Sequence, residues 1–270
     1  MYKSFYQMGL NPFDKSIPEA NHFKSHDFNE MLYRLNYLKD IRGIGVFTAP
    51  PGMGKSFALR CFTHDLNPSL YQVAYICLST ISIGEFYRQF CSSLGLPEKG
   101  GKTGMFKAIQ DYVFMLYKEK RSPLIIIIDE AQYLNTAILN DIKMLMNYKY
   151  DSVNCFTLIL CGESYLNHTL KKPVHEALRQ RISVHYNFNG LSDEEVMEYI
   201  SHKLKCAGAS PTIIDSSAIK AIHGYANGVP RLIDNVMTDA LMVGAQLKHK
   251  TINSDTILAA IENQQLPTNI

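Results

Sequence analysis

The stretch Ala49-Pro50-Pro51-Gly52-Met53-Gly54-Lys55-Ser56 lies between a short apolar run and a segment with helical character. A strand, a glycine-containing turn and a helix in this order are the context that a phosphate-binding loop requires. The glycines allow the backbone to approach a phosphate closely, and the amides at the helix N-terminus point at the anion. The stretch therefore predicts a site for nucleotide phosphates, with an ordinary strand-to-helix turn as the alternative for this motif alone.

The residues of this loop have separate expected roles. Lys55 is expected to reach the β- and γ-phosphates, and the Ser56 hydroxyl is expected to bind Mg²⁺. Ala49 stands where the first glycine of the motif is usual, and its small side chain is expected to be tolerated with some loss of backbone freedom. The expected nucleotide contacts are Pro51, Gly52, Met53, Gly54, Lys55, Ser56 and Phe57.

A second motif further along the chain supports the first. Residues 124–128 are all apolar and four of the five are β-branched, which is typical of a central parallel strand buried on both faces. Asp129 and Glu130 follow directly, at the strand end where open α/β sheets place their ligands. We expect Asp129 to hold Mg²⁺, directly or through water, and Glu130 to orient and deprotonate the attacking water. An acidic strand end that merely caps a helix is the alternative, which the phosphate loop makes improbable.

Composition sets wider limits. The chain has 270 residues, of which 46% are hydrophobic, enough for one large core and a smaller satellite domain. The formal net charge of +2 neither demands nor excludes nucleic acid as a partner. The longest apolar run, 124–128, is far shorter than a membrane span, and no signal peptide is evident. Because the six cysteines contain no Cys-x-x-Cys pair, we expect buried, reduced thiols in a cytoplasmic protein.

Apolar periodicity predicts the other elements of an α/β domain. Strands are expected at 71–77, 156–163 and 182–188, and helices at 27–40, 55–66, 83–94, 106–119, 136–146 and 175–181. Glu163 ends one of these strands. We expect it to lie beside the acidic strand end, where such a residue senses the γ-phosphate.

Two segments outside these elements carry further candidates. Residues 95–104 contain several glycines and lysines and are expected to form a mobile loop, which carries Lys99, Lys102 and Thr103. Residues 1–30 are rich in turns and aromatic side chains. This N-terminal arm is expected either to lie on the sheet edge and pack against an adenine, or to cover a hydrophobic groove.

The composition changes after about residue 190. Residues 192–195, Ser-Asp-Glu-Glu, form a capping box that opens a helix to about 205. Further helices are expected at 216–225, 230–247 and 254–263, with Pro230 suited to a first helical turn. The expected domains are therefore 1–190, an α/β nucleotide-binding domain with its N-terminal arm, and 191–270, an all-helical domain.

Taken together, these motifs resemble the AAA+ ATPases of the ExeA-like secretion-ATPase group. That group includes the transposition helper ATPases TniB, TnsC and, more distantly, MuB. The residues that carry the resemblance run across most of the chain: Asn11-Pro12-Phe13, the phosphate loop, Asp129-Glu130-Ala131-Gln132, Glu163, Arg179-Gln180-Arg181, residues 191–195 and residues 228–234.

The resemblance implies a P-loop NTPase (AAA+) fold, with a five-stranded parallel sheet in the order 5-1-4-3-2 between helices and a C-terminal helical lid. It implies ATP bound between the subunits of a ring or helical filament. Arg231 matches the sensor-2 arginine that reaches the γ-phosphate from the lid. Arg179 or Arg181 matches the arginine finger offered to a neighbouring subunit, with a solvated helix face as the alternative. Glu163 stands where family members often carry glutamine, and a carboxylate near the γ-phosphate is electrostatically unfavourable.

Three functions follow from this resemblance. The first is an ATP-dependent regulator of transposition, a homo-oligomer that assembles on duplex DNA, selects the target and recruits a transposase. Its DNA contacts are expected to be phosphate-directed. Lys99, Lys102 and Thr103 are expected to line a central channel, and the alternative is that they lie in a solvated surface loop. This function is favoured because the chain is little more than an AAA+ module without a membrane segment. The second is a secretion-type ATPase with a membrane partner, and the third is a soluble nucleotide switch without a DNA role.

Overall fold

The computed structural model describes residues 2–14, 22–77, 79, 82–120, 122–149 and 152–264. These residues form two compact units. The α/β unit comprises residues 30–51 and 55–188, and the helical unit comprises the described parts of 1–29, 52–54 and 189–270. The last residues of the expected C-terminal domain, 265–270, lie outside the described residues.

A five-stranded parallel sheet forms the centre of the α/β unit. Its strands lie side by side in the order β2-β3-β4-β1-β5, which confirms the order expected from the family resemblance. They are β1 (Ile44–Thr48), β2 (Gln72–Cys77), β3 (Leu124–Asp129), β4 (Phe156–Gly162) and β5 (Ile182–Asn187). Every residue of β1, β3 and β4 is buried, because helices cover both faces of the central strands.

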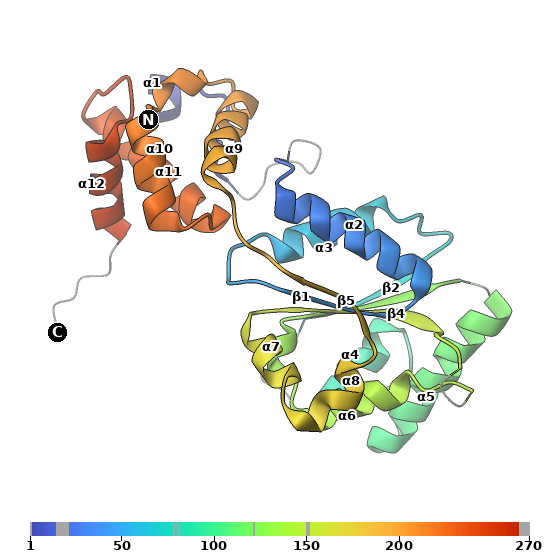
Figure 1. Ribbon diagram of the computed structural model, residues 1–270. Helices are drawn as coiled ribbons and strands as arrows, with labels where there is room; N and C mark the ends of the chain where they lie inside the picture. The colour runs from blue at the N-terminus through green and yellow to red at the C-terminus, as the bar shows by residue number, and fades with distance from the viewer. Residues whose placement is uncertain are drawn as a thin grey trace. The chain divides into compact units, whose positions relative to one another are not determined.

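Helices pack on both faces of this sheet. Figure 1 shows α2 and α3 along one face and α4 to α8 along the other. Their bounds are α2 (His26–Ile41), α3 (Lys55–Asp65), α4 (Ile83–Ser93), α5 (Gly101–Met115), α6 (Thr136–Leu145), α7 (Tyr165–Leu170) and α8 (Glu176–Arg179). Aromatic residues of α4 belong to one continuous core with Ile126 and Ile128 of β3. The strands that carry the predicted nucleotide-site residues are therefore packed within the core of this unit.

The helical unit has a core of its own. Its elements are α1 (Tyr2–Phe5), α9 (Asp193–Cys206), α10 (Ser216–Ala226), α11 (Pro230–Gln246) and α12 (Ser254–Gln264). The expected capping box is present, with Ser192 and Glu195 exchanging both side chain-to-backbone hydrogen bonds. Pro230 occupies the first turn of α11. Among the described residues, no helix is long and apolar enough to cross a membrane.

The N-terminal arm packs within the helical unit. Tyr6, Met8 and Phe13 are buried in the core of this unit, and the Tyr6 hydroxyl donates a hydrogen bond to the His249 carbonyl at 2.8 Å. The sequence places the arm with the first domain, whereas the structure groups it with the C-terminal helices, because these helices supply the apolar surface that buries its aromatic rings. The described part of the arm therefore packs against the C-terminal helices.

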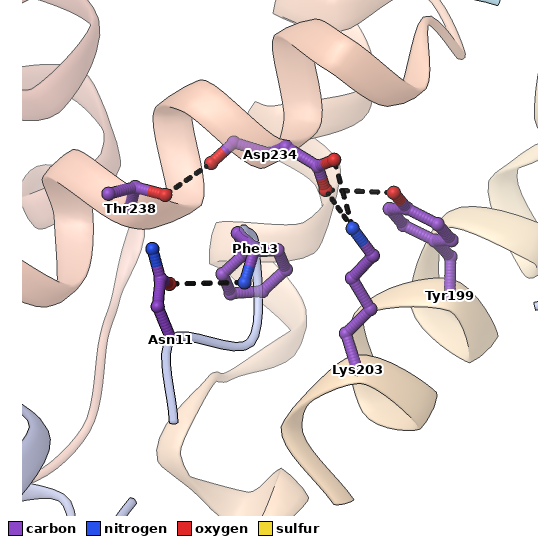
Figure 2. A network of polar contacts seen from close by, with 6 residues as sticks. All are labelled: Asn11, Phe13, Tyr199, Lys203, Asp234 and Thr238. Carbon is purple, nitrogen blue, oxygen red and sulfur yellow. Dashed lines mark hydrogen bonds and ion pairs between the residues drawn. The ribbon is translucent and has the colours of Figure 1, made fainter. Parts of the chain in front are cut away.

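A partly buried ion pair lies beside the arm (Figure 2). Lys203 on α9 contacts both carboxylate oxygens of Asp234 on α11 at 2.9 Å, and the Tyr199 hydroxyl donates to the same carboxylate at 2.8 Å. The Lys203 ammonium also lies 5.7 Å from the centroid of the Phe13 ring. Burial raises the pKa of the Asp234 carboxyl, and the Lys203 charge opposes this rise. The contacts join the arm to two helices of the unit.

The six cysteines form no disulfide. Four are buried, as the sequence predicts for reduced thiols, but Cys77 is exposed and Cys206 is half-buried. The expectation of uniform burial is wrong for Cys77 because β2 is an edge strand and alternate side chains of it face outward.

Candidate functional site

The phosphate loop connects β1 to α3, as predicted. Gly52 and Gly54 have φ values of 85° and 91°, in the left-handed region where a side chain is strained. A Cβ at Gly54 would meet no atom within 4 Å. Glycine is therefore required at Gly54 by backbone conformation, and the space beside it is open to a ligand.

Lys55, the first residue of α3, folds back over the loop. Its ammonium donates hydrogen bonds to the carbonyls of Ala49 at 2.8 Å and Pro50 at 3.2 Å. The side chain is only 9% exposed. A lysine ammonium has three donors, so these two carbonyls hold the charge in place and leave one donor for an anion.

Asp129, at the end of β3, is held from three directions. Its Oδ2 atom accepts hydrogen bonds from the Ser56 hydroxyl at 2.9 Å and the Tyr75 hydroxyl at 2.8 Å. Its Oδ1 atom accepts one from the backbone N–H of Glu130 at 2.9 Å. Burial and the hydrogen bond to Asp129 raise the pKa of Tyr75, so this phenol stays a donor. The sequence motifs give no sign of Tyr75.

The paired oxygens of Ser56 and Asp129 suit a magnesium ion. Mg²⁺ prefers hard oxygen ligands and usually takes one or two carboxylates together with water and phosphate oxygens. Within the part of the chain that the structure describes, no group of three or more His, Cys, Asp or Glu could hold a metal. A protein-only cage is therefore absent there, and Ser56 and Asp129 would share the ion with a nucleotide.

Glu130 begins a short 3₁₀ turn, Ala131–Tyr133, with a left-handed φ of 55°. Its side chain makes no capping hydrogen bond to that turn, which argues against a purely structural cap. Instead its Oε2 atom accepts a hydrogen bond from the Gln132 side-chain amide at 2.7 Å. The left-handed backbone at Glu130 thus ends the extended course of β3 at this residue.

Glu163 lies where the sequence predicts, directly after β4, the strand beside β3. Its backbone N–H donates a hydrogen bond to Oε1 of Gln132 at 3.0 Å. The side chain of Gln132 therefore joins the ends of β3 and β4. Gln132 is part of the motif Asp-Glu-Ala-Gln, but the motif alone does not show its hydrogen-bond partners, which depend on the pairing of β3 with β4. Sensing of the γ-phosphate by Glu163 stays a prediction.

The arginines lie in different parts of the fold. Arg179 donates to the carbonyls of Leu170 and Lys171 at 3.2 and 3.1 Å, and Arg181 donates to the Lys143 carbonyl at 2.9 Å. Both precede β5, and the strands of this sheet are parallel, so they lie at the opposite end of the sheet from the phosphate loop. Within one subunit they do not reach the Lys55 site.

Arg231 belongs to the helical unit, at the start of α11. Its side chain is exposed, and its backbone N–H donates to the carbonyl of Gly52 at 3.3 Å. A Cβ at Gly52 would lie 2.7 Å from the Cβ of Arg231. This glycine is therefore needed both for its backbone conformation and for close packing against α11.

The candidate DNA residues are only partly in a loop. The predicted loop, 95–104, ends at residue 100, because α5 begins at Gly101 and contains Lys102 and Thr103. Met105, Ile109 and Val113 bury one face of α5, and this packing outweighs the low helix propensity of the glycines. The Lys102 ammonium pairs with Asp141 at 2.7 Å. Lys99 stays in the loop and is exposed.

Part of the chain matches a known domain family. Residues 38–170 match the family model for the AAA domain. The chain is 30% identical over 267 residues to General secretion pathway protein A of Aeromonas hydrophila, covering 97% of this chain and 48% of that protein. The chain thus spans about half the length of the curated relatives it matches.

Solved structures share the fold. Cdc6p of Pyrobaculum aerophilum has a TM-score of 0.68 at 16% identity, over 96% of this chain and 72% of that one. ORC1 of Aeropyrum pernix, in complex with DNA, has a TM-score of 0.65 at 14% identity, over 93% and 68%. At these identities the likeness concerns the fold alone. The chain therefore has the α/β P-loop NTPase fold, and its residues 38–170 are similar to the AAA domain.

Proposed function

We propose that the chain is an AAA+ ATPase that binds ATP with Mg²⁺ and hydrolyses it. The observation that carries this proposal is the hydrogen bond between Ser56 and Asp129. It forms beside the buried Lys55, whose ammonium is already held by backbone carbonyls of the loop. Such preorganised charge costs no rearrangement when a phosphate arrives.

Each residue of the site has a distinct task in this proposal. Lys55 donates to phosphate oxygens, and Ser56 and Asp129 hold the magnesium ion, which when bound neutralises phosphate charge. Glu130 orients a water molecule and accepts its proton. Arg231 contacts the γ-phosphate from the helical unit, and Arg179 or Arg181 acts on the site of a neighbouring subunit, since neither reaches its own.

We further propose that ATP-bound subunits assemble on duplex DNA in the cytoplasm, as a ring or filament, and regulate transposition by selecting the target and recruiting a transposase. The sequence motifs shared with transposition helper ATPases support this. The likeness to ORC1 in complex with DNA supports a DNA role for the fold. Lys99, exposed in its loop, is a suitable contact for a DNA phosphate, whereas Lys102 would first have to leave Asp141.

A secretion-type ATPase that works with a membrane partner is the second candidate. The 30% identity to General secretion pathway protein A over nearly the whole chain favours it. The two candidates share the nucleotide site and differ in what the nucleotide controls.

One assay separates these functions. ATP turnover and the anisotropy of a fluorescent duplex would be measured together, with a slowly hydrolysed ATP analogue and with ADP. A DNA regulator binds the duplex with the analogue and releases it with ADP, and Lys55→Ala abolishes both binding and turnover. Turnover without DNA binding in either nucleotide state would contradict the DNA role and favour the secretion candidate. A wild-type chain without turnover would contradict the ATPase itself.

A further inference from the structure

Gln132 lies at the nucleotide site but has no part in the mechanism above. We propose that Gln132 is a positioning residue, which holds the carboxylate of Glu130 in its working orientation and joins it to the end of β4. This inference rests on the proposed ATPase, because it assigns a role within ATP hydrolysis.

Both ends of the Gln132 amide are engaged. The Nε2 atom donates to Oε2 of Glu130 at 2.7 Å, and the Oε1 atom accepts from the backbone N–H of Glu163 at 3.0 Å. A backbone N–H can only donate, so the amide oxygen must face Glu163 and the NH₂ group must face the carboxylate. The surroundings of Gln132 thus fix which way its amide points.

The chain leaves room for this side chain at Gly162, the last residue of β4. A Cβ there would lie 2.6 Å from Oε1 of Gln132 and 3.1 Å from its backbone nitrogen. Gly162 is not among the glycines with positive φ. Space for Gln132, rather than backbone conformation, therefore explains a glycine at this position.

Without Gln132, the Glu130 carboxylate would have no hydrogen bond from the neighbouring backbone to fix its orientation. Glu130 stands at the start of a three-residue turn, half-exposed, and its side chain makes no capping hydrogen bond to the backbone of that turn. A free carboxylate in this setting would sample several rotamers. One hydrogen bond from Gln132 selects a single orientation, and through Glu163 that orientation depends on the end of β4.

Gln132→Met tests this role, since methionine matches glutamine in length but forms neither hydrogen bond. We expect kcat for ATP to fall about 10- to 100-fold, as for a misplaced catalytic group, with KM changed less than about twofold. In a Glu130→Ala background, the same substitution should change the single-turnover rate less than about twofold, because Gln132 acts through Glu130. Gly162→Ala, which pushes a methyl group against the amide, should lower kcat in the same direction.

A second readout needs no nucleotide. In the free protein, Gln132→Met removes the acceptor of the Glu163 N–H, so hydrogen exchange at that amide should accelerate by about tenfold or more. Exchange at other protected amides should stay unchanged, which confirms that the variant is folded. Tyr133→Phe is the matched control, because Tyr133 lies in the same turn with its side chain 49% exposed, and both readouts should match the wild type.

Three results would overturn the proposal. These are a kcat for Gln132→Met within twofold of the wild type, an equal loss in the presence and absence of the Glu130 side chain, or unchanged exchange at Glu163. None of these results contradicts the proposed ATPase if Glu130→Ala alone, in the otherwise wild-type chain, still slows ATP hydrolysis strongly. A wild-type chain without turnover would instead overturn the proposed function, and the role of Gln132 with it.

Discussion

Asp129 receives hydrogen bonds from Ser56, Tyr75 and the backbone of Glu130, so its carboxylate is fixed before any ligand binds. The sequence predicts two of these residues because they belong to local motifs with a known order. Tyr75 escapes prediction because it reaches Asp129 only through strand pairing. Cys77 lies opposite Asp129 in the β2–β3 register, and Tyr75, two residues earlier, shares its face.

Tyr75→Phe should weaken magnesium binding. The substitution removes one of the two donors to Oδ2 and leaves the ring in place. Loss of such a supporting contact typically costs 10- to 100-fold in metal affinity, and we expect about three- to tenfold because Tyr75 is 49% exposed. The Mg²⁺ concentration for half-maximal ATP turnover would be measured, with Tyr133→Phe as the control. An unchanged magnesium requirement would remove Tyr75 from the site.

Lys99 and Lys102 should behave differently. If Lys99 contacts a DNA phosphate, Lys99→Ala lowers the slope of log K against log salt by about one. Lys102→Ala should leave that slope unchanged and lower the free energy of unfolding by about 0.5 kcal/mol, the value of a partly exposed ion pair, because Lys102 is paired with Asp141. Salt titrations of DNA binding and chemical unfolding measure the two effects. A slope lowered only by Lys102→Ala would reverse the assignment.

At the level of elements, strong local patterns predict well and packing-dependent ones do not. The strand of isoleucines before Asp129 and the capped helix α9 both lie within a residue or two of their predicted bounds. The start of α5 does not, because the run Gly101–Gly104 has poor helix propensity and becomes helical only through the burial of the face that follows it.

The helical unit should show a pH-dependent stability that originates at Asp234. Burial raises the pKa of this carboxyl in the folded protein above its ordinary value of 3.8. At a pH between the pKa of the unfolded state and the higher pKa of the folded state, the folded protein keeps a proton on Asp234 that the unfolded chain has released. The contribution is therefore full below about pH 4 and is lost as the pH rises through the folded pKa, by at most about 1.4 kcal/mol per pH unit.

Asp234→Asn removes this contribution. The free energy of unfolding of the variant should therefore improve relative to the wild type as the pH rises from 4 to 7. Glu198→Gln, an exposed substitution on α9, is the control and should follow the wild type. If the wild type instead gains relative to Asp234→Asn over this range, the attraction of Lys203 outweighs burial.

On the scale of the whole molecule, the strand order of the α/β unit agrees with the order that the family resemblance implies. The place of the N-terminal arm could not be predicted. Its aromatic residues have no strand or helix period, and the surface that buries Phe13 is built from helices at the other end of the chain.

The arginines before β5 should act between subunits. Arg179 and Arg181 lie away from the phosphate loop of their own sheet. A mixture of the double variant Arg179→Ala, Arg181→Ala with Lys55→Ala should therefore recover part of the ATP turnover, because some interfaces pair an intact arginine with an intact loop. Turnover would be measured across mixing ratios. No recovery at any ratio would contradict an action in trans.

Turnover by Glu130→Gln tests the central claim, that this chain hydrolyses ATP with Glu130 as the base. Glutamine keeps the size and one acceptor oxygen but cannot take the proton, and Lys55, Ser56 and Asp129 are untouched. The rate should fall about 10²- to 10⁴-fold while the Kd for ATP with Mg²⁺ stays within about twofold, since loss of a base alone does not weaken binding. Glu119→Gln, exposed in the π-helical segment Leu116–Lys120 that follows α5, should hydrolyse ATP at the wild-type rate. Wild-type turnover by Glu130→Gln would contradict the claim.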